Sequence, residues 1–135
     1  MELQLRIVGV LLIVLALVHA GFPKYFRWKE DLGGLQLINR QIMHVHTFFI
    51  ALMVFLMGVL CLTSAAEIKG TPLGRRVALG LGVFWAARLL IQCFGYSSRL
   101  WRGKKFETAV HVAFVILWTY LSAVFLAIWA ISGWK

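Results

Sequence analysis

The sequence predicts an all-α integral membrane protein that folds as an antiparallel bundle of four transmembrane helices. Of its 135 residues, 61% are hydrophobic and only 14% are charged. A soluble domain of this size could not bury so much apolar surface. Four apolar runs can each cross a bilayer core, which takes about 20 helical residues. These runs cover residues 5–22, 42–63, 77–96 and 109–134. Because their connections are short, we expect a single membrane domain spanning residues 1–135.

The first apolar run has two interpretations. Its stretch 7–20 is similar to a signal peptide, and residues 18–20 would pass as the small-residue cleavage site. However, only Arg6 precedes the apolar run, whereas Lys24, Arg27 and Lys29 follow it, which is the reverse of a secretory signal. We therefore expect a retained first transmembrane helix.

The segment between the first two helices mixes aromatic and basic residues. Pro23 is suited to start a short helix, and Gly33 with Gly34 is suited to end it. Aromatic and basic side chains together favour the head-group layer of a membrane. The segment therefore predicts a short interfacial helix, with an ordinary anchoring loop as the alternative.

The basic residues flank the apolar runs, a pattern typical of membrane orientation and anionic lipid contact. We therefore expect a lipid bilayer as partner and no nucleic acid, despite the net charge of +9. Eight Lys and Arg residues lie on the side where the first helix ends, against five on the side of the termini. The eight are Lys24, Arg27, Lys29, Arg40, Arg99, Arg102, Lys104 and Lys105; the five are Arg6, Lys69, Arg75, Arg76 and Lys135. This bias predicts both termini outside and the other side cytoplasmic, in a bacterial-type inner (plasma) membrane.

The third helix carries a stripe of small residues, Ala78, Gly82 and Ala86, spaced four apart. Such a stripe allows close approach of another helix. That helix belongs either to the same chain or to a partner. We expect the stripe to serve docking to other membrane subunits or to a second copy.

All four histidines fall in the same half of the predicted bundle. His19 lies near the end of the first helix, His44 and His46 near the start of the second, and His111 near the start of the fourth. Ionisable side chains inside a membrane segment are costly, so they mark candidate functional sites. His44 and His46 are separated by about 200° of helix rotation. His44 shares its face with small residues and is the inward candidate, whereas His46 points elsewhere.

Two further pairs place polar groups in the same half. Arg88 and Gln92 are four residues apart on one face of the third helix, and Glu107 and His111 are four apart at the start of the fourth. Every predicted helix therefore contributes at least one polar candidate to this half.

Three chemistries could use this set. A b-type haem could take His44 with His111, or His19 with His111, as axial ligands, with Arg88 on a propionate. A non-haem transition metal could use His19, His44, His111 and Glu107. A quinone could exchange protons with the histidines while Arg88 holds a carbonyl.

Each candidate also has an ordinary structural interpretation. Histidines near helix ends are often interfacial residues or hydrogen-bond partners between helices. Arg88 could extend to the membrane surface, and Glu107 fits a first-turn acid stabilised by the helix dipole better than a ligand.

The leading hypothesis is a small membrane redox subunit or enzyme that binds haem or a metal through the histidines. The rival is a non-catalytic accessory subunit of a larger membrane complex. No specific catalytic motif occurs in the sequence, which leaves open whether the protein is an enzyme.

Overall fold

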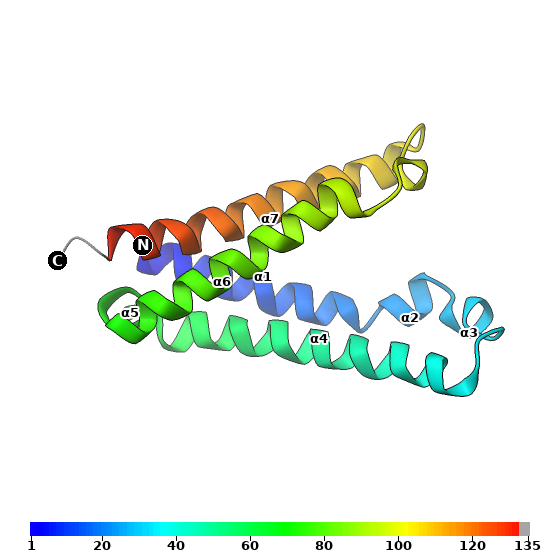
Figure 1. The fold of residues 1–135 in the computed structure, drawn as a ribbon, viewed down its shortest axis with the longest axis horizontal. Helices are drawn as coiled ribbons and strands as arrows, with labels where there is room; N and C mark the ends of the chain where they lie inside the picture. The colour runs from blue at the N-terminus through cyan, green and yellow to red at the C-terminus, as the bar shows by residue number, and fades with distance from the viewer. Residues whose placement is uncertain (133–135) are drawn as a thin grey trace. The chain divides into compact units, whose positions relative to one another are not determined.

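The computed structural model describes residues 1–132, and its regular elements over that range are all helices (Figure 1). Four segments of the described chain are long and apolar enough to cross a membrane, which confirms the predicted all-α class and helix number. They are α1 (Glu2–His19), α4 (Leu37–Thr63), α6 (Pro72–Leu90) with the π-helix η1 (Ile91–Gly95), and α7 (Lys105–Ile131). The short elements are α2 (Phe22–Tyr25), α3 (Trp28–Asp31), α5 (Ala65–Gly70) and the 3-10 helix η2 (Ser98–Leu100).

All four long helices begin before the apolar runs that predicted them, with α1 at Glu2 rather than residue 5. α4 begins at Leu37 rather than residue 42, and α7 at Lys105 rather than residue 109. α6 begins at Pro72 because Thr71 caps it, accepting a hydrogen bond from the Gly74 backbone N–H at 2.9 Å. Hydropathy marks the apolar part of a helix, and the helix continues into polar flanks. The predicted end of the fourth helix at residue 134 lies outside the described residues.

The segment after α1 contains two four-residue helices where one short helix was expected. Pro23 lies in the first turn of α2, as predicted. Arg27 then adopts a left-handed conformation, with φ 54°, and separates α2 from α3. The Arg27 side chain forms an ion pair with Glu30 within α3.

The chain divides into two compact units, and the single-domain prediction stays a prediction. One unit is Leu3–Ala65 and the other is Met1–Glu2 with Ala66–Lys135. Within the first unit, α1 and α4 approach closely at two glycines. A Cβ on Gly9 would lie 2.9 Å from the Gly58 carbonyl oxygen, and a Cβ on Gly58 would lie 2.8 Å from the Gly9 carbonyl oxygen. Only glycine fits at this crossing.

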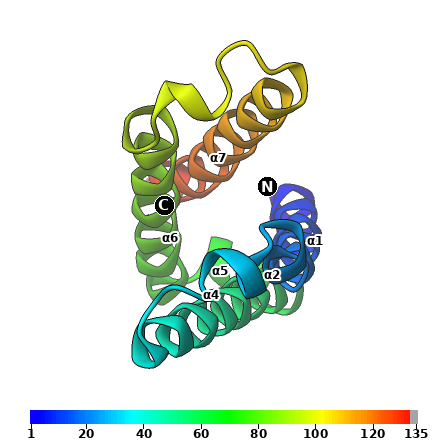
Figure 2. The same cartoon turned by 90° about the vertical axis from the view of Figure 1, so that its right-hand side faces the viewer.

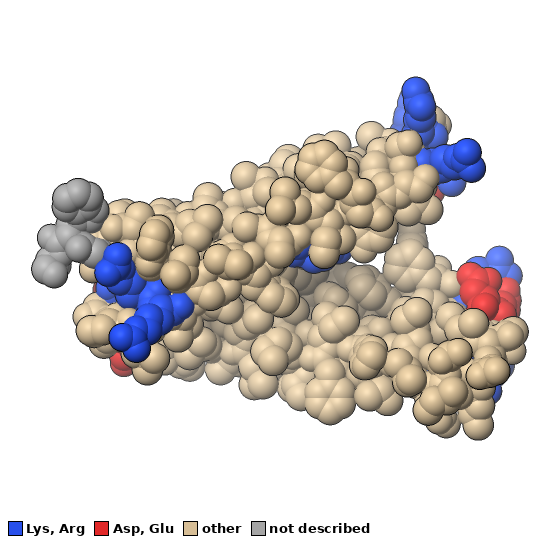
Figure 3. Space-filling model, viewed as in Figure 1, with Lys and Arg blue, Asp and Glu red and all other residues tan. Residues whose placement is uncertain are grey.

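Within the second unit, α6 and α7 pack side by side and run in opposite directions (Figures 1 and 2). At one end, Arg75 Nε donates to the Trp129 carbonyl oxygen at 3.1 Å. At the other end, Gln92 bonds to His111. Lys and Arg gather mainly at the helix ends, and the surface between them is mostly uncharged (Figure 3).

The small-residue stripe of α6 is partly used inside this unit. Ala78 and Gly82 are buried, and Gly82 lies against Leu126 of α7, whereas Ala86 is half-buried. Docking of a second protein along the stripe stays a prediction.

The contact at Gly82 leads to a test of the α6–α7 packing. A Cβ there would lie 2.7 Å from Leu126 Cδ2, whereas a Cβ on Gly80 would meet nothing within 4 Å. We expect Gly82→Leu to lower the free energy of unfolding by about 1–3 kcal/mol, because overpacking forces the helices apart. Gly80→Leu is the matched control and should be neutral or stabilising. Thermal unfolding in detergent, followed by circular dichroism, measures both. Equal behaviour of the two variants would contradict the packing described here.

Candidate functional site

Gln92 is the centre of a hydrogen-bond chain between η1 and α7. Its side chain is buried, and two residues of α7 reach it. Trp118 Nε1 donates to Gln92 Oε1 at 3.4 Å, and Gln92 Nε2 lies 2.8 Å from His111 Nδ1. The π-helix η1 carries Gln92, and such short π-helices are frequent at functional sites.

This chain assigns the tautomer of His111. An indole N–H can only donate, so the oxygen of the Gln92 amide must face Trp118. The NH₂ group of Gln92 therefore faces His111 and donates to Nδ1. Because Nδ1 accepts, the proton of the neutral imidazole is on Nε2. His111 thus offers an N–H donor at Nε2 and no free lone pair there.

The ring of His111 is also held in place by the loop before α7. The Trp101 ring stacks on it with 3.9 Å between centroids and 10° between planes. The Thr108 hydroxyl donates to the Trp101 carbonyl oxygen at 2.7 Å and so ties this loop to the first turns of α7. Stacking and hydrogen bonding together fix the orientation of the Nε2–H group.

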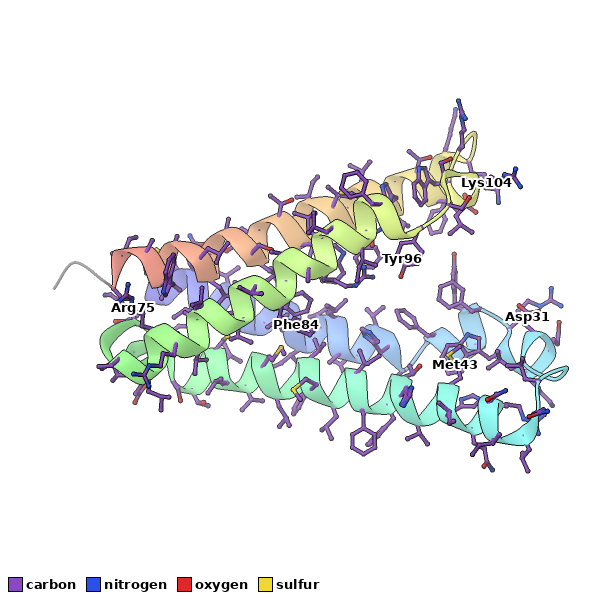
Figure 4. The ribbon with its side chains drawn as sticks, viewed as in Figure 1. Asp31, Met43, Arg75, Phe84, Tyr96 and Lys104 are labelled. Atoms are coloured by element: carbon purple, nitrogen blue, oxygen red, sulfur yellow. The ribbon has the colours of Figure 1, made fainter. Side chains whose placement is uncertain are left out.

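Arg88 lies one helical turn before Gln92 and is surrounded by aromatic rings. Its guanidinium carbon is 5.0 Å from the Trp118 ring centroid and 5.7 Å from that of Tyr96. Arg88 Nη2 also donates to the Tyr96 hydroxyl at 3.5 Å. Tyr96 lies just beyond η1, at the end of the segment opposite Arg75 (Figure 4). We call Arg88, Tyr96 and Trp118 the arginine cage.

Trp118 is the middle ring of a three-ring stack that supports the cage. Trp85 of α6 lies 5.1 Å from it and Phe114 of α7 lies 5.4 Å from it, both nearly parallel. Trp85 and Trp118 are almost fully buried. This stack holds the indole that both Arg88 and Gln92 contact.

The charge of Arg88 has no acidic partner within residues 1–132. The ion pairs of the described chain are Arg27–Glu30 and Lys69–Glu2. Arg88 Nη1 is buried and has no hydrogen-bond partner. Each cation–π contact supplies about 0.5–2 kcal/mol, whereas an arginine at the centre of a membrane helix costs about 2.5–3.5 kcal/mol on insertion scales. The two contacts of the cage are thus of the same order as this cost, and they leave Nη1 without a hydrogen-bond acceptor.

The other three histidines belong to the Leu3–Ala65 unit. Nδ1 of His19 lies 2.8 Å from the Leu15 carbonyl oxygen, which can only accept, so neutral His19 keeps a lone pair on Nε2. The His44 ring meets Trp28 edge-on at 5.2 Å between centroids. His44 and His46 are both exposed. His19 and His111 are thus held in opposite tautomers by their local partners.

No three His, Cys, Asp or Glu side chains within residues 1–132 are grouped so that they could hold a metal ion. Of the predicted metal ligands, His19 and His44 lie in one unit and Glu107 and His111 in the other. Glu107 is exposed in the first turn of α7, where the helix dipole favours an acid. Pairing of histidines across the two units stays a prediction.

Sequence reasoning predicted part of this site. Arg88 and Gln92 share a face, as expected, since both contact Trp118. Tyr96, Trp101 and Trp118 were not among the predicted site residues. The four-residue spacing that links Arg88 to Gln92 continues to Tyr96 and could have indicated it. The sequence holds no comparable signal for Trp101.

No protein-family model, curated protein or solved structure matches this chain.

Proposed function

We propose that this protein is a small membrane redox subunit whose α6–α7 pair binds the head group of a quinone. The observation that carries the proposal is the chain from Trp118 through Gln92 to His111, which leaves an oriented Nε2–H on His111. A quinone carbonyl accepts hydrogen bonds and donates none, so it complements this group. Hydrogen bonding to that oxygen also favours the charge that builds on it when a quinone is reduced.

The proposed membrane location of the helices supports a ligand that enters from the bilayer. Four membrane-length helices support an integral membrane protein, and we extend this to an antiparallel bundle with both termini outside a bacterial-type inner membrane. His111 lies two turns inside the start of α7, at a depth that a lipid-soluble head group reaches. The Trp101 ring beside it adds an aromatic surface suited to a planar ligand. This proposal does not require Arg88.

Titration with a short-chain quinone analogue tests the proposal, with quenching of tryptophan fluorescence as the readout. We expect saturable quenching by the wild-type protein in detergent. His111→Ala should weaken the apparent affinity about tenfold, because one hydrogen bond of about 1.4 kcal/mol is lost. His46→Ala is the matched control, since His46 is an exposed histidine of α4, and should bind like the wild type. Unsaturable quenching, or equal affinities of the two variants, would reject this function.

Haem or metal coordination remains the other form of the redox hypothesis. The tautomer of His111 disfavours ligation through Nε2, whereas that of His19 favours it, because a ligating histidine commonly donates its other N–H to a carbonyl. His19 is therefore the ligand we propose for such a centre, with His44 as the second histidine of the same unit. A visible spectrum and elemental analysis of the purified protein test it. A Soret band lost in His19→Ala supports haem.

The competing proposal is a non-catalytic accessory subunit of a membrane complex. In its favour, only Val54, Gly58 and Cys61 are buried along the 27 residues of α4. Many of the other side chains of this helix are exposed in the structure and could contact lipid or other membrane subunits. A colourless, metal-free preparation that binds no quinone would support this proposal over the redox one.

A further inference from the structure

The arginine cage shares Trp118 with the proposed quinone site, but it presents a different chemistry. His111 offers a neutral donor, whereas Arg88 offers a permanent positive charge. The rings of Tyr96 and Trp118 contact the guanidinium, and the Tyr96 hydroxyl accepts a hydrogen bond from Nη2. Nη1 remains buried without any partner. The missing element is an anion with acceptor oxygens.

We infer that the arginine cage binds a phosphate oxygen of an anionic membrane lipid. A guanidinium presents its N–H groups as a planar fork that matches the oxygens of a phosphate, and the aromatic contacts to its faces leave Nη1 without an acceptor. A phosphate would satisfy Nη1 and neutralise Arg88 at once. Tyr96 completes the site, because its hydroxyl holds the other guanidinium nitrogen at 3.5 Å.

The depth and direction of Arg88 favour a lipid head group. Arg88 precedes Gly95, the last residue of η1, by seven residues, or about 10 Å at the rise of an α-helix. The contact with Tyr96 directs the guanidinium toward that end of the segment. An arginine side chain in this position extends toward the head-group layer, where lipid phosphates lie.

The same end of the unit is rich in positive charge. Basic residues follow η1 in the connection to α7 and in its first turn, where Glu107 is the one acid of this described stretch. The basic residues are Arg99, Arg102, Lys104 and Lys105. Figure 3 shows Lys and Arg side chains projecting at this end of the α6–α7 pair. Such a cluster raises the local concentration of anionic lipids, and the cage would hold one of them at a defined place.

Native mass spectrometry of the full chain tests the inference. The protein is taken from nanodiscs that contain equal amounts of phosphatidylglycerol and phosphatidylcholine. We expect the wild type to retain phosphatidylglycerol in preference, and Arg88→Ala to lower the apparent affinity about tenfold. Arg75→Ala is the matched control, because Arg75 is an arginine of the same helix with its own cation–π contact, to Trp129. It should retain the lipid like the wild type.

Two outcomes measured on the wild type bear on the identity of the ligand and do not depend on variant folding. If the wild type retains the two lipids equally, the inference is wrong. Stabilisation by inorganic phosphate alone, with no preference for phosphatidylglycerol, would point to a soluble oxyanion and overturn the lipid assignment. Quinone binding that persists in Arg88→Ala would leave the proposed function intact, since that function rests on His111.

Discussion

Gln92→Glu is expected to weaken quinone binding at least tenfold by reversing the tautomer of His111. A carboxylate accepts from both neighbours, so it would take hydrogen bonds from Trp118 Nε1 and from His111 Nδ1. Arg88, one turn earlier, supports the ionised form of the new acid. The proton of His111 would then lie on Nδ1, and the lone pair on Nε2 would face the quinone oxygen. The loss of one hydrogen bond and a new repulsion predict at least a tenfold weaker affinity.

The measurement is the same quinone titration, with Gln92→Met as the control. Methionine keeps the approximate shape of glutamine and makes neither strong hydrogen bond, so it leaves the tautomer unassigned. We expect its affinity to fall between those of the wild type and Gln92→Glu. If Gln92→Glu binds the analogue as tightly as the wild type, Gln92 does not determine which nitrogen of His111 carries the proton.

Trp118→Ala is expected to cause the largest loss of stability in the α6–α7 unit. It removes the middle ring of the stack with Trp85 and Phe114, the donor to Gln92 and one wall of the arginine cage. Truncation of a buried tryptophan costs about 3–5 kcal/mol. Thermal unfolding in detergent should show this loss.

Two variants separate the roles of Trp118. Trp118→Phe keeps a ring in the stack and loses only the N–H, so it should retain most of the stability and free the Gln92 amide to turn. Trp129→Ala removes a tryptophan of the same helix that is 37% exposed, and should cost less than half as much as Trp118→Ala. A Trp118→Ala protein as stable as Trp129→Ala would contradict the central place of the stack.

The helix number and the polar face of α6 follow from sequence patterns with direct physical causes. Bilayer thickness sets the length of an apolar run, and helix geometry brings Arg88 and Gln92 to one face. Hydropathy does not find helix ends, because capping by Thr71 and polar flanks lengthen the helices beyond their apolar runs. These local rules account for most of the fold described here.

The connections within the site are harder to predict. In the sequence, Trp118 resembles an ordinary packing residue. It donates to Gln92, and so determines the tautomer of His111, only because the fold places it opposite Gln92. The π-helix η1 that carries Gln92 has no signature in the sequence pattern. Trp101 reaches His111 through a loop whose path depends on the Thr108 hydrogen bond. Tertiary partners, more than residue types, decide the chemistry of each histidine.

Nitrogen-15 NMR of histidine-labelled protein in detergent tests the central claim most directly. The His111 resonances are assigned by their absence from His111→Asn. The hydrogen-bond chain predicts that Nε2 of neutral His111 carries the proton and that Nδ1 does not. A protonated Nδ1 with an unprotonated Nε2 would contradict the assigned donor and, with it, the proposed quinone site.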